Sequence, residues 1–156
     1  SDKNTQEILD RHIGKKIIYI LILFVATLTI TSCDKWDCNG DLDGMWQLTE
    51  WRDNENNVKA TKDDMIFYSF QLQMASFRKL SEENYYVSSM LEVGSEQIRI
   101  YNPAIYDGDG HDKLFPMSVL SIVGVPEDGI FHIDVLTGST MKLKTNTQET
   151  LVFRKY

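Results

Sequence analysis

The feature that most constrains the fold of this chain is an alternation of apolar and polar residues that recurs from Gly44 onward. A period of two places neighbouring side chains on opposite faces of a β-strand. The alternation is clearest in residues 65–74, which are predicted to form one strand with a shared face made of Ile66, Tyr68, Phe70, Leu72 and Met74. Similar runs, also predicted to be strands, occupy residues 44–51, 84–93, 96–101, 130–136, 139–145 and 150–156.

Seven or eight strands of this kind, nearly all half-polar, favour an antiparallel sheet with one face in water. The links at residues 136–140 and 145–149 are short and rich in Gly, Thr and Asn, as hairpin turns are. No long helical repeat separates the strands, so a parallel crossover is not expected. The chain is therefore predicted to be all-β.

One interruption, residues 102–128, breaks the alternation. Pro116 suits the first turn of a short helix or lid segment. Leu114, Met117 and Leu120 would share the inner face of that helix. The run Val119–Val125 is rich in β-branched residues, which leaves a strand as the alternative.

The N-terminal part reads as a targeting segment. Two lysines precede an apolar run of 14 residues from Ile17 to Ile30, which is short for a membrane-spanning anchor of about 20 residues. The sequence Ile30-Thr31-Ser32-Cys33 resembles the lipobox of bacterial lipoproteins. That resemblance implies that residues 1–32 are a leader and signal peptide, and that Cys33 is acylated and becomes the new N-terminus. A cysteine that follows an ordinary signal by chance is the alternative.

Residues 33–43 are polar and acidic, and are predicted to be a flexible tether before a domain at 44–156. From Cys33 onward the chain has 12 Lys/Arg and 20 Asp/Glu, a net charge of −8. Such a surface repels phosphate backbones, which argues against nucleic-acid binding. Once Cys33 is acylated, Cys38 is the remaining thiol and no internal disulfide can form. We expect a monomer.

Two acidic stretches of the sequence are candidates for metal sites. Residues 39–50 match the spacing of a calcium loop, but the chain has no room for the upstream helix and no helical period downstream. The loop at 107–112 offers Asp107, Asp109 and Asp112, although Asp and Gly are also the usual residues of solvated turns. We therefore predict no metal and no cofactor, with those three aspartates as the weak candidates.

Catalytic motifs are not visible in the sequence. There is no G-x-S-x-G, C-x-x-C or H-E-x-x-H segment, and no glycine loop that would hold a phosphate. The two histidines after Cys33 are His111 in the acidic loop and His132 on the polar side of a strand. The chain is predicted not to be an enzyme.

Both ends of the predicted sheet resemble a known family. Gly44-Met45-Trp46 looks like the G-x-W of lipocalins, and Leu151-Val152-Phe153-Arg154 resembles their closing strand. Residues 33–156 as a whole are similar to small lipocalin-like lipoproteins of Gram-negative gut bacteria. The resemblance implies a small antiparallel up-and-down barrel of seven or eight strands. It also implies that Arg154 packs over Trp46 in a cation–π contact that closes one end.

Two functions follow from this resemblance, both for a lipoprotein of the cell envelope tethered to the outer membrane. In the first, the barrel binds a small apolar or amphiphilic ligand. In the second, side chains fill the barrel, and the protein is a non-enzymatic interaction or structural lipoprotein that acts through its loops. The candidate ligand-lining residues of the interior are Trp46, Tyr68, Phe70, Tyr85, Phe131 and Met141.

Overall fold

The computed structural model describes residues 39–81, 85–106 and 112–156. Ten strands and three short 3-10 helices lie in these ranges. The helices are η2 (Gly40–Leu42), η3 (Lys62–Asp64) and η4 (Met117–Val123). The strands are β1 (Gly44–Arg52), β2 (Val58–Thr61), β3 (Ile66–Gln71), β4 (Met74–Lys79), β5 (Tyr85–Val93), β6 (Gln97–Tyr106), β7 (Asp112–Leu114), β8 (Ile130–Leu136), β9 (Thr140–Thr145) and β10 (Thr150–Lys155).

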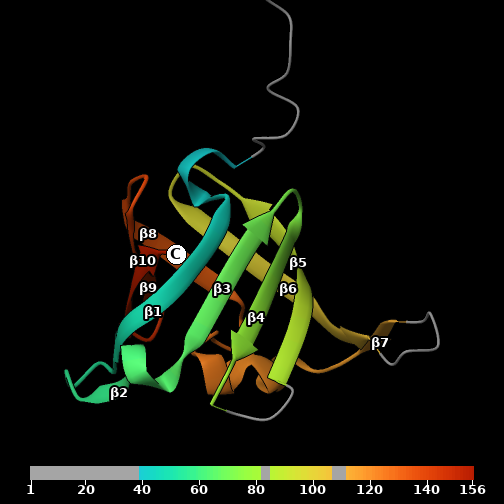
Figure 1. Ribbon diagram of the computed structural model, residues 1–156, viewed down its shortest axis with the longest axis horizontal. Coiled ribbons are helices and arrows are strands. Elements are labelled where there is room, and N and C mark those ends of the chain that lie inside the picture. Colours follow the sequence, from blue (N-terminus) through green and yellow to red (C-terminus); the bar gives the residue numbers. More distant parts are fainter. Residues whose placement is uncertain (1–38, 82–84, 107–111) are drawn as a thin grey trace, which may run out of the picture. The chain divides into compact units, whose positions relative to one another are not determined.

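Eight of the strands form a closed antiparallel barrel, as the resemblance implied (Figure 1). The order around the barrel is β1-β3-β4-β5-β6-β8-β9-β10, and pairing of β10 with β1 closes it. The short strands β2 and β7 lie outside this ring, paired with β1 and β6. Closure leaves the ring without an open sheet edge, which is how small antiparallel proteins avoid edge-to-edge association. The prediction of an all-β barrel is confirmed.

The core lies inside the barrel because alternate residues of each strand point inward. Trp46 on β1 is opposite Tyr68 on β3, which is opposite Phe77 on β4. Across the closing seam, Leu48 on β1 is opposite Phe153 on β10. All five side chains are at most 1% exposed. Side-chain alternation therefore accounts for both the buried interior and the polar outside.

The segment predicted as one strand at 65–74 is a strand followed by a turn, and that prediction was wrong in its second half. β3 ends at Gln71, and the next strand, β4, begins at Met74. Leu72 starts the two-residue turn with a φ of 56°, in the left-handed region. The turn reverses the chain, so Leu72 and Met74 are exposed although the alternation placed them inside. β4 itself, with Ala75 and Phe77 inward, was not predicted.

The helix expected after Pro116 is present as η4, and it crosses one end of the barrel (Figure 1). Pro116 is its N-cap, with a φ of −67°. Leu120 is buried, as predicted, but Leu114 is exposed in β7 and does not belong to the helix. The C-cap is Gly124, and its φ of 90° is a backbone conformation that glycine adopts at little cost.

Two tyrosine hydroxyls hold η4 on the barrel. Tyr68 donates a hydrogen bond to the Val123 carbonyl at 2.7 Å, and Tyr85 donates one to the Val119 carbonyl at 2.7 Å. Burial raises the pKa of Tyr85 to about 12 and raises the pKa of Tyr68 well above its usual value. Both tyrosines are therefore protonated donors at neutral pH.

Residues 39–43, predicted to be tether, are instead part of the folded barrel. Leu42 in η2 is fully buried, and its carbonyl accepts a 2.8 Å hydrogen bond from Trp46 Nε1. The Asn39 side chain donates to Asp43 Oδ1 at 2.6 Å and to the Leu72 carbonyl at 2.8 Å. The earlier part of the predicted tether, 33–38, and the signal segment before it lie outside the described residues. No helix among the described residues is long and apolar enough to cross a membrane.

Candidate functional site

The residues proposed to line a ligand pocket are core residues packed on one another. Trp46, Tyr68, Phe70, Phe131 and Met141 are 0–1% exposed, and Tyr85 is partly buried at the edge of the same cluster. The Tyr68 ring is central: its centroid lies 4.6–6.4 Å from those of Phe153, Phe77, Phe70 and Phe131. Aromatic rings at these separations are in contact. Side chains therefore occupy this part of the barrel interior.

One buried polar group lies within that packing. The Ser89 hydroxyl on β5 has no hydrogen-bond partner among the described residues, and the side chain is 3% exposed. An unpartnered buried hydroxyl lowers stability by its lost hydration. Ser89 is opposite Ala75 on β4, so two small side chains meet there.

The cation over Trp46 is Lys155 and not Arg154, which corrects the closure pair expected from the resemblance. Lys155 Nζ lies 4.9 Å from the Trp46 ring centroid and donates to the Asp41 carbonyl at 3.0 Å. Lys155 is directly opposite Trp46 in the β1–β10 register, whereas Arg154 is opposite Gln47 and exposed. Because Phe153 points inward, the next inward position along the strand is 155.

The side chains of the three aspartates predicted as weak metal candidates are not in the described part of the structure. Asp107 and Asp109 lie outside the described residues, as does the side chain of Asp112. Within the described ranges, no three His, Cys, Asp or Glu side chains come together in a way that could hold a metal ion. His132 lies on the barrel surface, where Nε2 is 2.7 Å from Asn146 Oδ1.

A surface groove of about 260 Å³ lies beside η4 and was not predicted. We call it the distal groove, and its main lining residues are Trp51, Lys59, Gly124, Val125, Glu127 and Glu149. Trp51 comes from the end of β1, Lys59 from β2 and Glu149 from the β9–β10 link. Gly124, Val125 and Glu127 come from the segment after η4. Residues far apart in the sequence meet here because β1 pairs with both β2 and β10.

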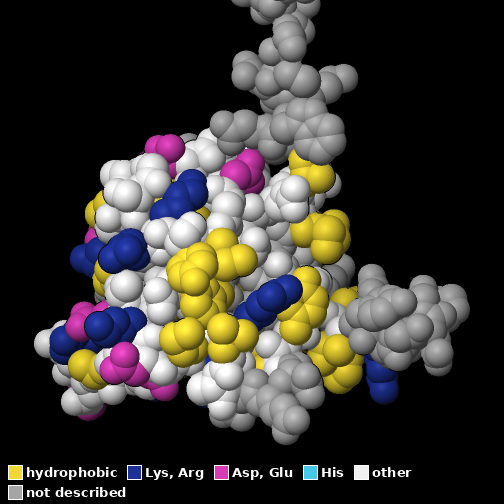
Figure 2. Space-filling view, in the orientation of Figure 1, with side chains coloured by type: hydrophobic (Ala, Val, Ile, Leu, Met, Phe, Trp, Pro, Cys, Tyr) yellow, Lys and Arg dark blue, Asp and Glu magenta, His cyan; other side chains and the backbone are white. Residues whose placement is uncertain are grey.

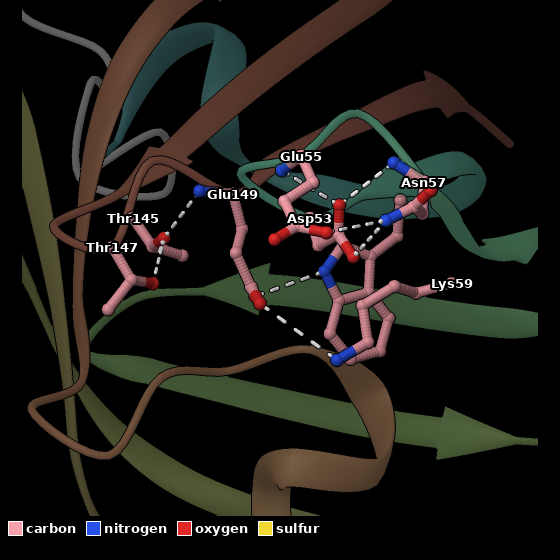
Figure 3. A network of polar contacts seen from close by, with 8 residues as sticks. Asp53, Glu55, Asn57, Lys59, Thr145, Thr147 and Glu149 are labelled. Atoms are coloured by element: carbon pink, nitrogen blue, oxygen red, sulfur yellow. Dashed lines mark hydrogen bonds and ion pairs between the residues drawn. The ribbon is translucent and has the colours of Figure 1, made fainter.

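A carboxylate, an ammonium group and an indole ring form the polar centre of the distal groove (Figure 3). Trp51 Nε1 donates to Glu149 Oε2 at 3.2 Å. Lys59 Nζ lies 3.9 Å from Glu149 Oε1 and 4.9 Å from the Trp51 ring centroid. Each of the three groups thus lies next to the other two, and the hydrogen bond between Trp51 and Glu149 orients the indole and the carboxylate.

The backbone around this centre is also fixed. The Glu149 N–H donates to Thr145 Oγ1 at 3.0 Å, and the Thr145 N–H donates to the Glu149 carbonyl at 3.0 Å. A side chain at Gly124 would place its Cβ 2.8 Å from Leu151 and 3.3 Å from the Trp51 ring. Glycine is therefore required where the segment after η4 passes over Trp51.

The β1–β2 turn, which connects Trp51 to Lys59 along the chain, carries polar contacts of its own (Figure 3). Asp53 accepts hydrogen bonds from the Asn57 backbone at 2.8 Å, the Asn57 amide at 3.1 Å and the Glu55 backbone at 3.0 Å. These bonds, those from Asn57 foremost, lower the pKa of Asp53. The turn before Lys59 is thus ordered and anionic, and the Lys59 ammonium also contributes to the lower pKa of Asp53.

Comparison with known proteins agrees with this architecture. The family model described as a lipocalin-like domain matches residues 27–156. The fold is similar to the crystal structure of a lipocalin-like protein from Bacteroides uniformis, with 24% identity over 75% of this chain and 100% of that chain, and a TM-score of 0.56. It is also similar to an uncharacterized protein from Bacteroides eggerthii, with 25% identity over 74% of this chain and 99% of that chain, and a TM-score of 0.52.

No curated protein matches the chain. The family match, however, covers every described strand, including the closing pair β1 and β10. The two solved structures share the barrel across nearly their whole length. This chain belongs to the lipocalin-like domain family.

Proposed function

We propose that this protein is a non-enzymatic lipoprotein of the cell envelope, tethered to the outer membrane by acyl chains on Cys33. Its barrel is a rigid scaffold, and the distal groove is the surface that recognises a protein partner. The observation that carries this proposal is the filled interior. Five of the six residues that would have to line a ligand pocket are 0–1% exposed, and the rings of Phe70 and Phe131 pack against that of Tyr68.

The filled interior favours a scaffold over a carrier for a geometric reason. Eight strands enclose a space that side chains can fill or that can hold one small ligand. Here Trp46, Phe77 and Phe153 occupy that space together with Tyr68. A ligand of the size of a fatty acid would have to displace several of these rings, each of which contributes a few kcal/mol to stability by burial.

The chemistry of the distal groove suits recognition of a protein. Tryptophan is among the residues that contribute most to binding at interfaces, and burial of a pre-oriented charge pair adds specificity. Trp51 and Glu149 are already joined by a hydrogen bond, so these two side chains lose little freedom on binding. The groove also lies at the end of the barrel opposite η2 (Figure 1).

Lipidation is tested by metabolic labelling with an alkynyl fatty acid in the native host. The Cys33→Ser variant should lose the label and leave the membrane fraction. Cys38→Ser is the matched control, five residues away, and should keep both. Equal labelling of wild type and Cys33→Ser would refute the anchor.

Partner recognition is tested by site-specific photo-crosslinking in intact cells. A photoreactive residue replaces Glu127, which lines the groove outside its polar centre, or, as control, Val135, which is exposed on the outside of β8. A discrete crosslinked species is expected from position 127 and not from 135, and Glu149→Gln should weaken it. Native mass spectrometry of the purified protein supplies the opposing test, because a lipid bound at one per barrel would overturn the scaffold interpretation.

A further inference from the structure

An exposed apolar patch lies at the η2 end of the barrel, partly on the outer wall and partly on the adjoining rim. Four side chains make up this patch, which we call the proximal patch: Met74 and Met90 on the outer wall, and Leu72 and Val93 on the rim. They are 37–52% exposed. Figure 2 shows separate groups of hydrophobic side chains along the β4–β5 side of the molecule, toward the right of the view.

The proximal patch is continuous across three strands. Met74 on β4 is opposite Met90 on β5, and Met90 is opposite Tyr101 on β6. A shallow surface groove of about 560 Å³ extends it, lined by Leu72, Val93, Tyr101 and other residues that include Asn39. Contiguous exposed apolar surface of this kind marks an interaction site in a soluble domain.

Leu72 is held outward at a backbone cost. Its φ of 56° is a conformation that glycine or asparagine adopts far more readily than leucine. The turn is fixed on both sides: Asn39 Nδ2 donates to the Leu72 carbonyl at 2.8 Å, and the Leu91 N–H donates to the Gln73 carbonyl at 2.9 Å. A strained apolar residue at an exposed tip points to a role in contact with something outside the barrel.

The length of the tether limits what that contact can be. Six residue steps separate Cys33, the proposed lipid anchor, from Asn39. At roughly 3.6 Å per residue they span at most about 20 Å. Asn39 is bonded to the tip of the β3–β4 turn itself, so the proximal patch stays within that reach of the membrane surface.

We propose that the proximal patch docks on the lipid surface, with Leu72 and Met74 entering the boundary between headgroups and acyl chains. This inference rests on the proposed lipidation of Cys33. Glu92, next to Val93, forms an ion pair with Arg99 at 3.6 Å, and the Lys155 ammonium lies with Asp41 and Asp43 at the same end of the barrel, so the charges there are of both signs. Docking is therefore driven by apolar burial and favours uncharged over anionic headgroups.

Docking would also set the orientation of the whole protein. The proximal patch and the distal groove lie toward opposite ends of the barrel, as the positions of the β3–β4 turn and η4 show (Figure 1). With one end on the membrane, the groove beside η4 is presented away from it. A short tether and a membrane-facing patch thus replace free rotation by one favoured orientation.

The test uses the full lipidated chain reconstituted in phosphatidylcholine vesicles that contain a nitroxide on the lipid acyl chains. In a Cys38→Ser background, a polarity-sensitive fluorophore is attached to Leu72→Cys, Met74→Cys or the control Val58→Cys. Val58 is 49% exposed on β2, near the distal groove. Quenching is expected to be at least threefold greater at positions 72 and 74 than at 58, and unchanged by salt.

The outcomes separate docking from anchoring. If the protein fails to float with the vesicles, lipidation of Cys33 is wrong, and the proposed function falls with it. If it floats but positions 72 and 74 are quenched no more than 58, docking is refuted while the anchor stands. The two patch positions provide independent readings, so misfolding of one labelled variant does not decide the result. An added Leu72→Asp substitution should reduce quenching at position 74.

Discussion

Replacement of Phe131 by alanine distinguishes a filled barrel from a hollow one. Phe131 is 0% exposed on β8, opposite Ile98 on β6 and Thr145 on β9, and its ring lies 6.4 Å from that of Tyr68. In a packed core, the loss combines the transfer free energy of the ring with the cavity left behind, about 3–5 kcal/mol. A ring that lined an open pocket would leave little new cavity, and its loss would cost about 1 kcal/mol or less.

The measurement is urea and thermal unfolding of the two proteins, followed by circular dichroism. For a domain of this size, the expected loss corresponds to a fall in Tm of roughly 10–20 °C. The total stability of a domain is about 5–15 kcal/mol, so a loss of about 3–5 kcal/mol is a large share of it. If Phe131→Ala does not fold, Phe131→Leu replaces it, with an expected loss of about 1–2 kcal/mol. Val135→Ala, exposed on the same strand, should change stability by less than about 0.5 kcal/mol. A loss for Phe131→Ala as small as that for Val135→Ala would refute the filled interior.

Five further variants test individual contacts, each by urea unfolding against wild type. Tyr68→Phe removes the buried hydrogen bond to η4 and should cost about 1–3 kcal/mol, whereas no loss would mean that η4 is held by packing alone. Because burial raises the folded pKa of Tyr85 to about 12, stability should be complete below pH 10 and fall as the pH rises toward 12. A Tyr85→Phe variant should show a weaker decline. Ser89→Ala removes an unpartnered buried hydroxyl and should leave stability unchanged or higher; a loss above about 1 kcal/mol would reveal a partner. Lys155→Met should cost about 0.5–1.5 kcal/mol and Arg154→Met close to nothing, and the reverse order would restore the closure pair first expected.

Two of the wrong expectations about individual side chains, those for Arg154 and Leu72, have different physical origins. The inward position of Lys155 could have been predicted from the sequence, because Leu151 and Phe153 point inward and the period of two continues to 155. The family resemblance pointed to Arg154 instead. The exposed position of Leu72 could not have been predicted in the same way. Its alternation with Phe70 and Met74 continues across the turn, and no Gly or Asn marks the reversal.

The distal groove could not have been predicted from any local pattern. Lys59 and Glu149 are 90 positions apart, and each is an ordinary polar residue of a turn or short strand. They meet beside Trp51 because β1 has two partners near its end, β2 and β10. Pairing of distant strands depends on closure of the whole barrel, which no window of ten or twenty residues contains.

The sequence by itself determined the class of the fold and most of its strands. Alternation is a local property, and a chain that alternates over seven runs can bury its apolar side chains only as half-exposed antiparallel strands. The tertiary structure decided which strands close the ring, which cation covers Trp46, and that aromatic side chains occupy the interior around Tyr68. Those outcomes depend on register and on the summed volume of inward side chains, which are properties of the assembled barrel and not of any one strand.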